Sequence, residues 1–203
     1  MFIRKIRATA LLGAALLAAA PAMAVEKGDW LVRVGASNVD PDSNNHPVVE
    51  VDDGTSLTFN ISYFLTDGLA VELLAAAPFE HDIYLAGGGA KVGDTNHLPP
   101  TLSLQYHFNT AGTFKPYVGL GYNWTTFMSE STEGALEGVA LDLKNSSGLA
   151  YQVGLDFMLD ENWLLNLDVR WIDIDTEAFL DGVSIGDVEI DPTVYGIHLG
   201  YRF

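Results

Sequence analysis

Cysteine is absent from the 203-residue sequence, so disulfides, thiol nucleophiles and thiolate metal sites are excluded. Basic residues are scarce: 10 Lys and Arg stand against 27 Asp and Glu, and the formal net charge is −17. This charge argues against a nucleic-acid partner, because a phosphate backbone requires clustered Lys and Arg. Disorder is disfavoured, since 48% hydrophobic and 11% aromatic residues can bury a substantial core. The length predicts one folded domain.

Long apolar runs are missing except in the first segment. Residues 1–24 place three basic residues before an apolar run over 8–20 and end on Ala22-Met23-Ala24. This order is typical of a cleaved secretory signal peptide. A membrane-anchoring helix is the weaker interpretation, because a span needs about 18 or more unbroken apolar residues. We therefore expect one mature domain, residues 25–203, that works outside the inner membrane.

Apolar and polar residues alternate through most of the remaining chain, which indicates β-strands. From Trp30, for example, Trp30, Val32 and Val34 share one face, whereas Leu31 and Arg33 share the other. Alternation alone also suits a soluble sandwich with one face in water. Eight such segments are present: 30–37, 56–63, 69–76, 101–108, 118–125, 149–157, 163–171 and 194–203.

Two features favour a membrane barrel. Aromatic residues stand near segment ends on the apolar faces, as in the interfacial girdles of outer-membrane barrels. The connections also alternate in length, with short ones at 66–68, 109–115 and 160–162 and long ones at 38–54, 80–97, 128–145 and 173–189. Strands cross hydrocarbon only in a closed sheet, because lipid offers backbone groups no hydrogen-bond partner. The prediction is an all-β fold: an eight-stranded antiparallel transmembrane β-barrel with short periplasmic turns and long extracellular loops, in a Gram-negative outer membrane.

The last strand carries a further signal. The chain ends on Phe203, preceded at alternate positions by Tyr201, Leu199, Ile197 and Tyr195. A terminal aromatic with this spacing resembles the signal read by the outer-membrane insertion machinery, which we expect as a partner. Outer-membrane lipid and lipopolysaccharide are the other expected partners.

Particular stretches resemble the OmpW family of small outer-membrane proteins. They are VELLAAAPFEHDI from Val71, HLPPTLSLQYHF from His97, KPYVGLGYNWTTF from Lys115, VRWIDIDT from Val169 and GYRF from Gly200. The resemblance covers essentially the whole mature chain and implies a barrel with a narrow, largely apolar interior that passes small hydrophobic molecules inward. AlkL-type alkane importers are similar proteins. The resemblance also implies a constriction made by a leucine and an aromatic residue; these positions correspond to Leu74 and to Arg170, which departs from the pattern.

The predicted inward faces carry charges that are costly in a narrow tube unless they are paired. We expect a lumen polar plug across the periplasmic half, in which arginines pair with carboxylates: Arg33, Arg170 and Arg202 with Glu72, Asp156 and Asp168. Toward the extracellular ends of the strands the inward residues become less polar. Leu31 is an exception, because it is apolar although it stands early in the first segment. The apolar residues at the extracellular ends are Leu74, Ala76, Gly119, Ala150 and Ile172.

A greasy upper funnel above a charged plug predicts a channel for passive uptake of a small apolar ligand. The expected lining and gate are Leu74, Ala76, Arg170 and Ile172, with lateral release into the bilayer as a hypothesis. Either Arg170 extends the plug, or a bulge in the strand turns Trp171 inward in its place. The alternative function is a non-transporting structural or surface-receptor barrel with a packed interior.

Other chemistry has weaker support. The acidic long connections are expected to be solvated, and divalent cations shared with lipopolysaccharide are a lesser possibility. His81 and His97 flank one loop, but two histidines without a third ligand make a poor metal site. Ser103 and His107 share an inward face, yet nothing resembles a nucleophile elbow. We expect no cofactor, no metal and no enzymatic activity.

Overall fold

The computed structural model describes residues 25–42, 48–110 and 112–203, so the predicted signal peptide lies outside the described residues. Within them the chain forms fourteen strands and one short 3-10 helix, η1 (Gly134–Leu136). The strands are β1 (Trp30–Asp40), β2 (Val49–Val51), β3 (Gly54–Phe64), β4 (Leu69–Ala76), β5 (Phe79–Leu85), β6 (Lys91–Leu98), β7 (Thr101–His107), β8 (Phe114–Thr132), β9 (Leu141–Leu143), β10 (Ser146–Met158), β11 (Trp163–Ile172), β12 (Asp175–Leu180), β13 (Val183–Glu189) and β14 (Thr193–Arg202).

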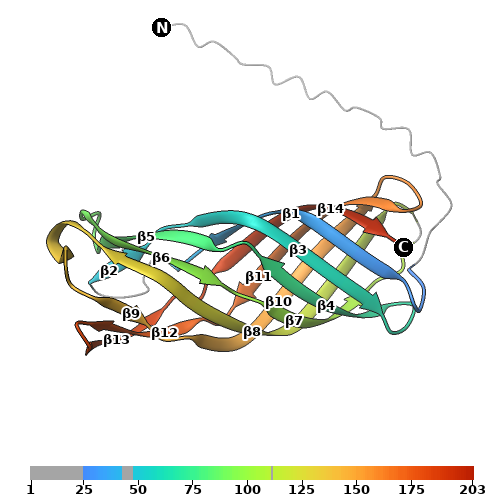
Figure 1. Ribbon diagram of the computed structural model, residues 1–203. Coiled ribbons are helices and arrows are strands. Elements are labelled where there is room, and N and C mark those ends of the chain that lie inside the picture. Colours follow the sequence, from blue (N-terminus) through green and yellow to red (C-terminus); the bar gives the residue numbers. More distant parts are fainter. Residues whose placement is uncertain (1–24, 43–47, 111) are drawn as a thin grey trace, which may run out of the picture.

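Eight of these strands close into one antiparallel barrel, which confirms the predicted fold (Figure 1). Their order is β10-β11-β14-β1-β3-β4-β7-β8, and β8 pairs with β10 to complete the wall. The first and last strands pair from Leu31 opposite Arg202 to Asp40 opposite Thr193. Closure satisfies the ladder hydrogen bonds that an open sheet would expose to lipid.

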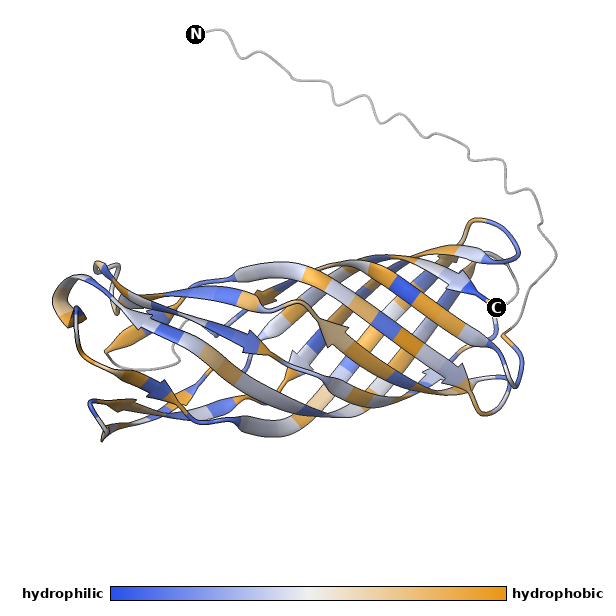
Figure 2. Cartoon of the chain, viewed as in Figure 1, coloured by the Kyte–Doolittle hydropathy of each residue, from blue (hydrophilic) through white to orange (hydrophobic). Residues whose placement is uncertain are grey.

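The outer surface of the barrel is apolar. Outward residues of successive strands, such as Leu57, Leu104 and Ile197, remain exposed although they are hydrophobic, and hydrophobic and hydrophilic residues alternate along the strands in Figure 2. Aromatic pairs mark the two ends of this band: Trp30 packs on Tyr63 at one end, and Tyr122 packs on Trp124 at the other. This is the surface that a lipid bilayer covers. Among the described residues, no helix is long and apolar enough to span a membrane.

The two ends of the barrel differ. The short turns after β3, β7 and β10 lie at the end that also holds the carboxyl terminus and the start of β1 (Figure 1). Short turns identify this end as periplasmic.

The extracellular end is built from β-hairpins rather than from irregular loops. Residues 79–98 form the hairpin β5–β6, and residues 175–189 form the hairpin β12–β13, which pairs with β9. The strand pair β5–β6 joins the top of β8 on one side and β2 on the other. The connections at this end are long, as predicted. They contain strands, however, which extend the barrel wall outward and enclose its upper interior.

A candidate binding chamber in the barrel interior

The periplasmic end of the lumen is closed by an apolar layer that the sequence did not predict. Leu31, Phe64, Ala70 and Leu164 are buried there in one cluster with Val25, and Met158 packs against it. Leu31 is therefore part of a seal and not an isolated exception. Its inward direction follows from strand alternation, but the convergence of four strands and the amino-terminal segment does not.

Above this seal lies the polar plug. Nη1 of Arg33 lies 3.2 Å from Oε2 of Glu72, and Nη2 of Arg33 lies 2.8 Å from Oδ2 of Asp156. Nη2 of Arg170 lies 2.9 Å from Oε1 of Glu72, and its Nε lies 2.8 Å from Oδ2 of Asp168. Glu72 therefore joins the two arginines, and five of the six expected plug residues form one buried network.

Neutral side chains complete this network. Gln152 donates to Asp168 at 2.7 Å, and Asn166 donates both to Asp156 at 2.8 Å and to the hydroxyl of Tyr117 at 2.9 Å. The Tyr117 ring fills the lumen beside Gly154, where a Cβ would lie 2.1 Å from the ring. The plug is thus filled across the tube by hydrogen-bonded side chains, and an ionic path would have to displace them.

Arg202 does not belong to the plug, which corrects the prediction. Its Nη1 lies 3.8 Å from Oδ2 of Asp29, and its Nη2 donates to the carbonyl oxygen of Glu161 at 2.9 Å. The register explains the difference: Arg202 lies opposite Leu31, one inward position nearer the periplasm than Arg33. Arg202 is part of the periplasmic rim.

An apolar chamber occupies the lumen at the extracellular end, with a volume of about 250 Å³. Its walls come from the top of β1, from the hairpins β5–β6 and β12–β13, and from β8. The lining is mostly aliphatic and includes Val39, Ile83, Val92, Ile174 and Val188. An apolar cavity of about 150 Å³ accepts benzene, so this chamber has room for a somewhat larger molecule.

The expected gate residues lie beneath this chamber. Leu74, Arg170 and Ile172 line a second, much smaller space of about 10 Å³, roughly the size of one water. Ala76 packs at the edge of the apolar cluster that includes Ile172. Leu74 and Ile172 therefore form part of the floor of the chamber, with the plug directly below.

Position 170 extends the plug, because the Arg170 guanidinium is bound to Glu72 and Asp168. The bulge that would turn Trp171 inward is absent: β11 pairs in continuous register with β10 and β14, and Trp171 faces outward. An aromatic ring at the floor comes instead from Phe79, which is buried and stacks on His97 with ring centroids 5.4 Å apart.

Two of the other expected apolar positions lie at different depths in the lumen. Ala150 belongs to the apolar cluster of the upper lumen. Gly119 lies in the plug layer, where a Cβ would stand 2.9 Å from Oε1 of Gln152. Strand alternation predicts that both face inward, but not the depth at which each one lies.

Two histidines stand on the β5–β6 wall of the chamber. Their rings stack with centroids 4.9 Å apart, and both are buried. Nδ1 of His81 lies 2.7 Å from the carbonyl oxygen of Asp52, whereas Nε2 of each ring has no hydrogen-bond partner among the described residues. His97 lies opposite Phe127, beyond the outer aromatic residue Trp124, so the pair stands on the extracellular side of the lipid band.

Burial, and then the charge of a protonated His81, lower the pKa of His97 to about 3. Burial also lowers the pKa of His81. We expect the His97 ring to remain neutral at pH 5, which the imidazole nitrogen shifts in NMR would report, assigned with His97→Phe. Since the unfolded chain takes up this proton near pH 6.5, the unfolding free energy should fall as the pH drops from about 6.5 toward 3. A His97 midpoint near pH 6.5 would contradict this expectation.

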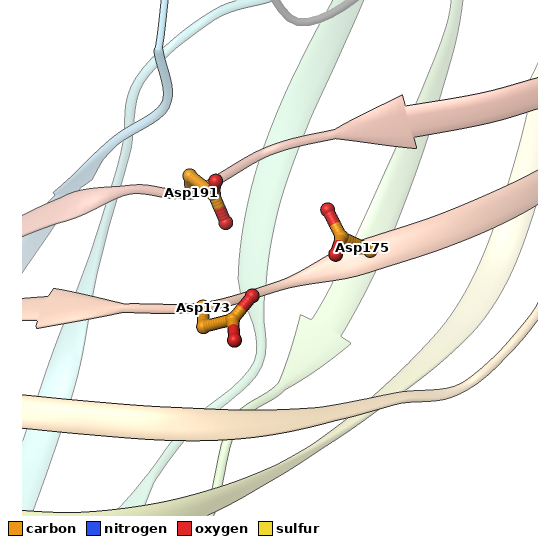
Figure 3. A group of neighbouring side chains, drawn as sticks. All are labelled: Asp173, Asp175 and Asp191. Atoms are coloured by element: carbon orange, nitrogen blue, oxygen red, sulfur yellow. The ribbon is translucent and has the colours of Figure 1, made fainter.

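Three exposed carboxylates, Asp173, Asp175 and Asp191, converge near the base of the β12–β13 hairpin (Figure 3). One oxygen from each lies within 4.8 Å of the others. Partial burial, and then the charges of Asp191 and Asp173, raise the pKa of Asp175. Asp191 also accepts a hydrogen bond from the amide of Ile174 at 3.1 Å. Exposed acidic groups alone do not define a metal site.

The serine and histidine considered for catalysis are not a working pair. Ser103 and His107 are four residues apart on β7, which separates them by about 13 Å along a strand. Nε2 of His107 instead lies 3.1 Å from Oε1 of Gln105. Both side chains are buried in the barrel interior.

Comparisons with known proteins agree with this architecture. The OmpW family model matches residues 26–203. Outer membrane protein W of Vibrio cholerae is 42% identical over 93% of this chain and 95% of its own length. Outer membrane protein AlkL of Ectopseudomonas oleovorans is 31% identical over 87% of this chain and 83% of its own.

Solved structures show the same barrel. The crystal structure of OprG from Pseudomonas aeruginosa matches with a TM-score of 0.80 and 36% identity, over 89% of this chain and 98% of that one. The solid-state NMR structure of AlkL in lipid bilayers matches with a TM-score of 0.66 and 27% identity, over 99% and 97%. The chain belongs to the OmpW family of outer-membrane β-barrel proteins.

Proposed function

We propose that this barrel takes up small apolar molecules passively and that the chamber is where they bind. The observation that carries the proposal is an apolar cavity of about 250 Å³ placed at the extracellular end of the lumen. Apolar side chains also reach its mouth, since Val48 and Ile185 line it and are exposed. Such a surface attracts apolar solutes because binding removes hydrocarbon from water.

The plug supports a route that does not run straight through the barrel. A molecule leaving the chamber downward would meet Arg170 and Glu72 and then the apolar seal. Separating buried ion pairs leaves uncompensated charges in a low-dielectric interior, which is strongly unfavourable. An apolar molecule cannot offset that cost with hydrogen bonds of its own.

The wall offers a sideways route at the level of the chamber floor. The β4–β7 ladder ends where Leu74 faces Thr101, and the β5–β6 ladder begins where Phe79 faces His97. Between them, residues 75–78 face residues 98–100, and three of these seven residues are prolines, which have no amide hydrogen. We name this stretch the proline seam and propose lateral release through it into the bilayer.

Side chains of the neighbouring strands donate hydrogen bonds to the backbone carbonyl oxygens of the seam. Ser56 Oγ on β3 donates to the carbonyl oxygens of Ala77 and Pro78, at 3.0 and 3.1 Å. Asn123 Nδ2 on β8 donates to those of Pro99 and Pro100, at 3.1 and 3.3 Å. Because each side of the seam hydrogen-bonds to the strand on its far side, the two sides can part without breaking a ladder between them.

Filling the chamber tests the proposed function. Ala178 is buried and lines the cavity, so Ala178→Trp places an indole in the space that a ligand would use. We expect whole-cell oxidation of naphthalene by a co-expressed cytoplasmic dioxygenase to fall to the rate of cells that lack the barrel. The matched control is Leu167→Trp, because Leu167 is exposed on the outer face of β11, away from the proline seam, and it should keep the wild-type rate.

Equal amounts of barrel in the outer membrane and equal dioxygenase activity in broken cells make the rates comparable. If cells with and without the wild-type barrel oxidised naphthalene equally fast, the alternative of a non-transporting structural or receptor barrel would be favoured instead.

A further inference from the structure

The chamber is apolar, but its polar lining residues are not equivalent. The hydroxyls of three lining threonines donate to acceptors of the protein: Thr125 to Oδ1 of Asn123 at 2.7 Å, Thr132 to the carbonyl oxygen of Val139 at 2.7 Å and Thr176 to that of Lys144 at 2.6 Å. By contrast, the rings of His81 and His97 line the chamber, and within the described part of the chain their buried Nε2 atoms have no partner. The unused hydrogen-bonding capacity of the chamber therefore includes these two rings, which stand on one wall.

The protonation of His81 follows from its partner. A carbonyl oxygen only accepts hydrogen bonds, so the 2.7 Å contact between Nδ1 and the carbonyl of Asp52 requires a hydrogen on Nδ1. In a neutral ring Nε2 is then an acceptor. Residue 54 of β3, which lies beside this edge, is glycine, and a Cβ there would lie 3.0 Å from Nε2.

His97 is held at the chamber floor. Its ring is stacked between Phe79 and His81, with centroid distances of 5.4 and 4.9 Å. It lines both the chamber and the small space beneath it. The stacked neighbours cover the two faces of the ring, and Nε2 at its edge is buried and without a partner among the described residues.

A buried polar atom without a partner is destabilising, and native structures rarely keep one unless a water, an ion or a ligand completes it. A hydroxyl group suits this pair, because its one hydrogen donates to the His81 acceptor while its oxygen accepts from His97 in the tautomer that carries a hydrogen on Nε2. A pure hydrocarbon leaves both nitrogen atoms unpaired.

We propose that the preferred ligands of the chamber are apolar molecules that carry one hydroxyl group, such as small phenols and alcohols, with His81 and His97 as the specificity-determining residues. This inference rests on the proposed function and narrows its substrate class. The wall formed by Ile174, Ala178 and Val188 receives the apolar body, while the histidine wall receives the hydroxyl.

Three probes of similar shape separate these contributions. Naphthalene has no hydrogen-bonding group, 2-methoxynaphthalene has an oxygen without a hydrogen, and 2-naphthol has a hydroxyl. Binding to the full barrel in lipid nanodiscs is measured by equilibrium dialysis, with empty nanodiscs subtracted to remove partitioning into lipid. We expect the wild-type barrel to prefer 2-naphthol to 2-methoxynaphthalene by about tenfold, the effect of one net hydrogen bond.

The variants locate the preference. His81→Phe keeps an aromatic ring and should reduce this preference toward one. His97→Phe should reduce the preference for 2-naphthol over naphthalene. Naphthalene should still bind to both variants, which also reports that the chamber is folded. His97→Gln restores a hydrogen-bonding group and should recover part of the preference. Thr55→Val removes the hydroxyl of an exposed residue outside the chamber and should leave the preference unchanged.

The outcomes separate the two proposals. Equal affinities for 2-naphthol and 2-methoxynaphthalene in the wild-type barrel would overturn the hydroxyl preference and leave uptake of apolar molecules standing. A tenfold preference that survives in both phenylalanine variants would overturn the role of the histidines. If none of the three probes bound above empty nanodiscs, the proposed function itself would fail.

Discussion

Replacing Glu72 by glutamine is expected to lower the free energy of unfolding of the barrel by about 3–5 kcal/mol. The substitution preserves size and removes the carboxylate that both Arg33 and Arg170 share. All three side chains are buried, so water cannot replace the lost charge. Only the carboxylates of Asp156 and Asp168 then compensate the two guanidinium charges, and the hydrogen bond that each arginine donates to residue 72 is weakened.

Urea unfolding in phospholipid vesicles, followed by tryptophan fluorescence, measures this loss. Trp30, Trp124, Trp163 and Trp171 all face outward, so their emission reports transfer from lipid to water. The control is Glu80→Gln, which removes an exposed carboxylate on β5 and should change the free energy by no more than about 0.5 kcal/mol. Equal stability of Glu72→Gln and the wild type would mean that the plug does not hold the barrel together.

Much of the barrel could be predicted because its physical rule is local. Lipid outside and a filled lumen inside force each strand to alternate, so Trp30 and Val32 face outward and Leu31 and Arg33 face inward without any knowledge of partners. Pairing between Arg33 and the inward carboxylates follows from the cost of isolated charges in a narrow tube. The height of each inward residue depends on strand stagger, which is why Arg202 was placed in the wrong layer.

An apolar upper lumen was predicted, but the strands that wall the chamber were not, because they break the local rule. The β5–β6 hairpin changes register between Ile83 and Tyr84, and β12 does so between Ala178 and Phe179. A bulge reverses the alternation beyond it, so each half shows too few repeats to indicate a strand. One usable signal was present at Asp181-Gly182, a dipeptide typical of tight hairpin turns, where both residues have positive φ.

A charge at Leu74 should abolish uptake through the chamber, and the sign of the charge should decide what happens to stability. Leu74 is buried and lines the small space that Arg170 also borders, where Nη1 of Arg170 has no partner among the described residues. Leu74→Glu places a carboxylate beside that unpaired donor. Leu74→Lys places a second cation there, where the carboxylates that bind Arg170 are already engaged and the added charge has no partner.

Both variants should reduce naphthalene uptake by tenfold or more. An apolar molecule that covers the charged floor removes water from the ion and cannot solvate it, which costs roughly 1.4 kcal/mol or more. Urea unfolding should rank them differently: Leu74→Lys should lose about 3 kcal/mol or more, and Leu74→Glu clearly less. Leu74→Ala separates charge from packing, since it enlarges the floor, costs about 2–5 kcal/mol of stability and keeps uptake. Wild-type uptake by a correctly inserted Leu74→Glu barrel would remove Leu74 from the path, whereas loss of uptake in Leu74→Ala would show that the packing of the floor, and not its lack of charge, is what the transported molecule requires.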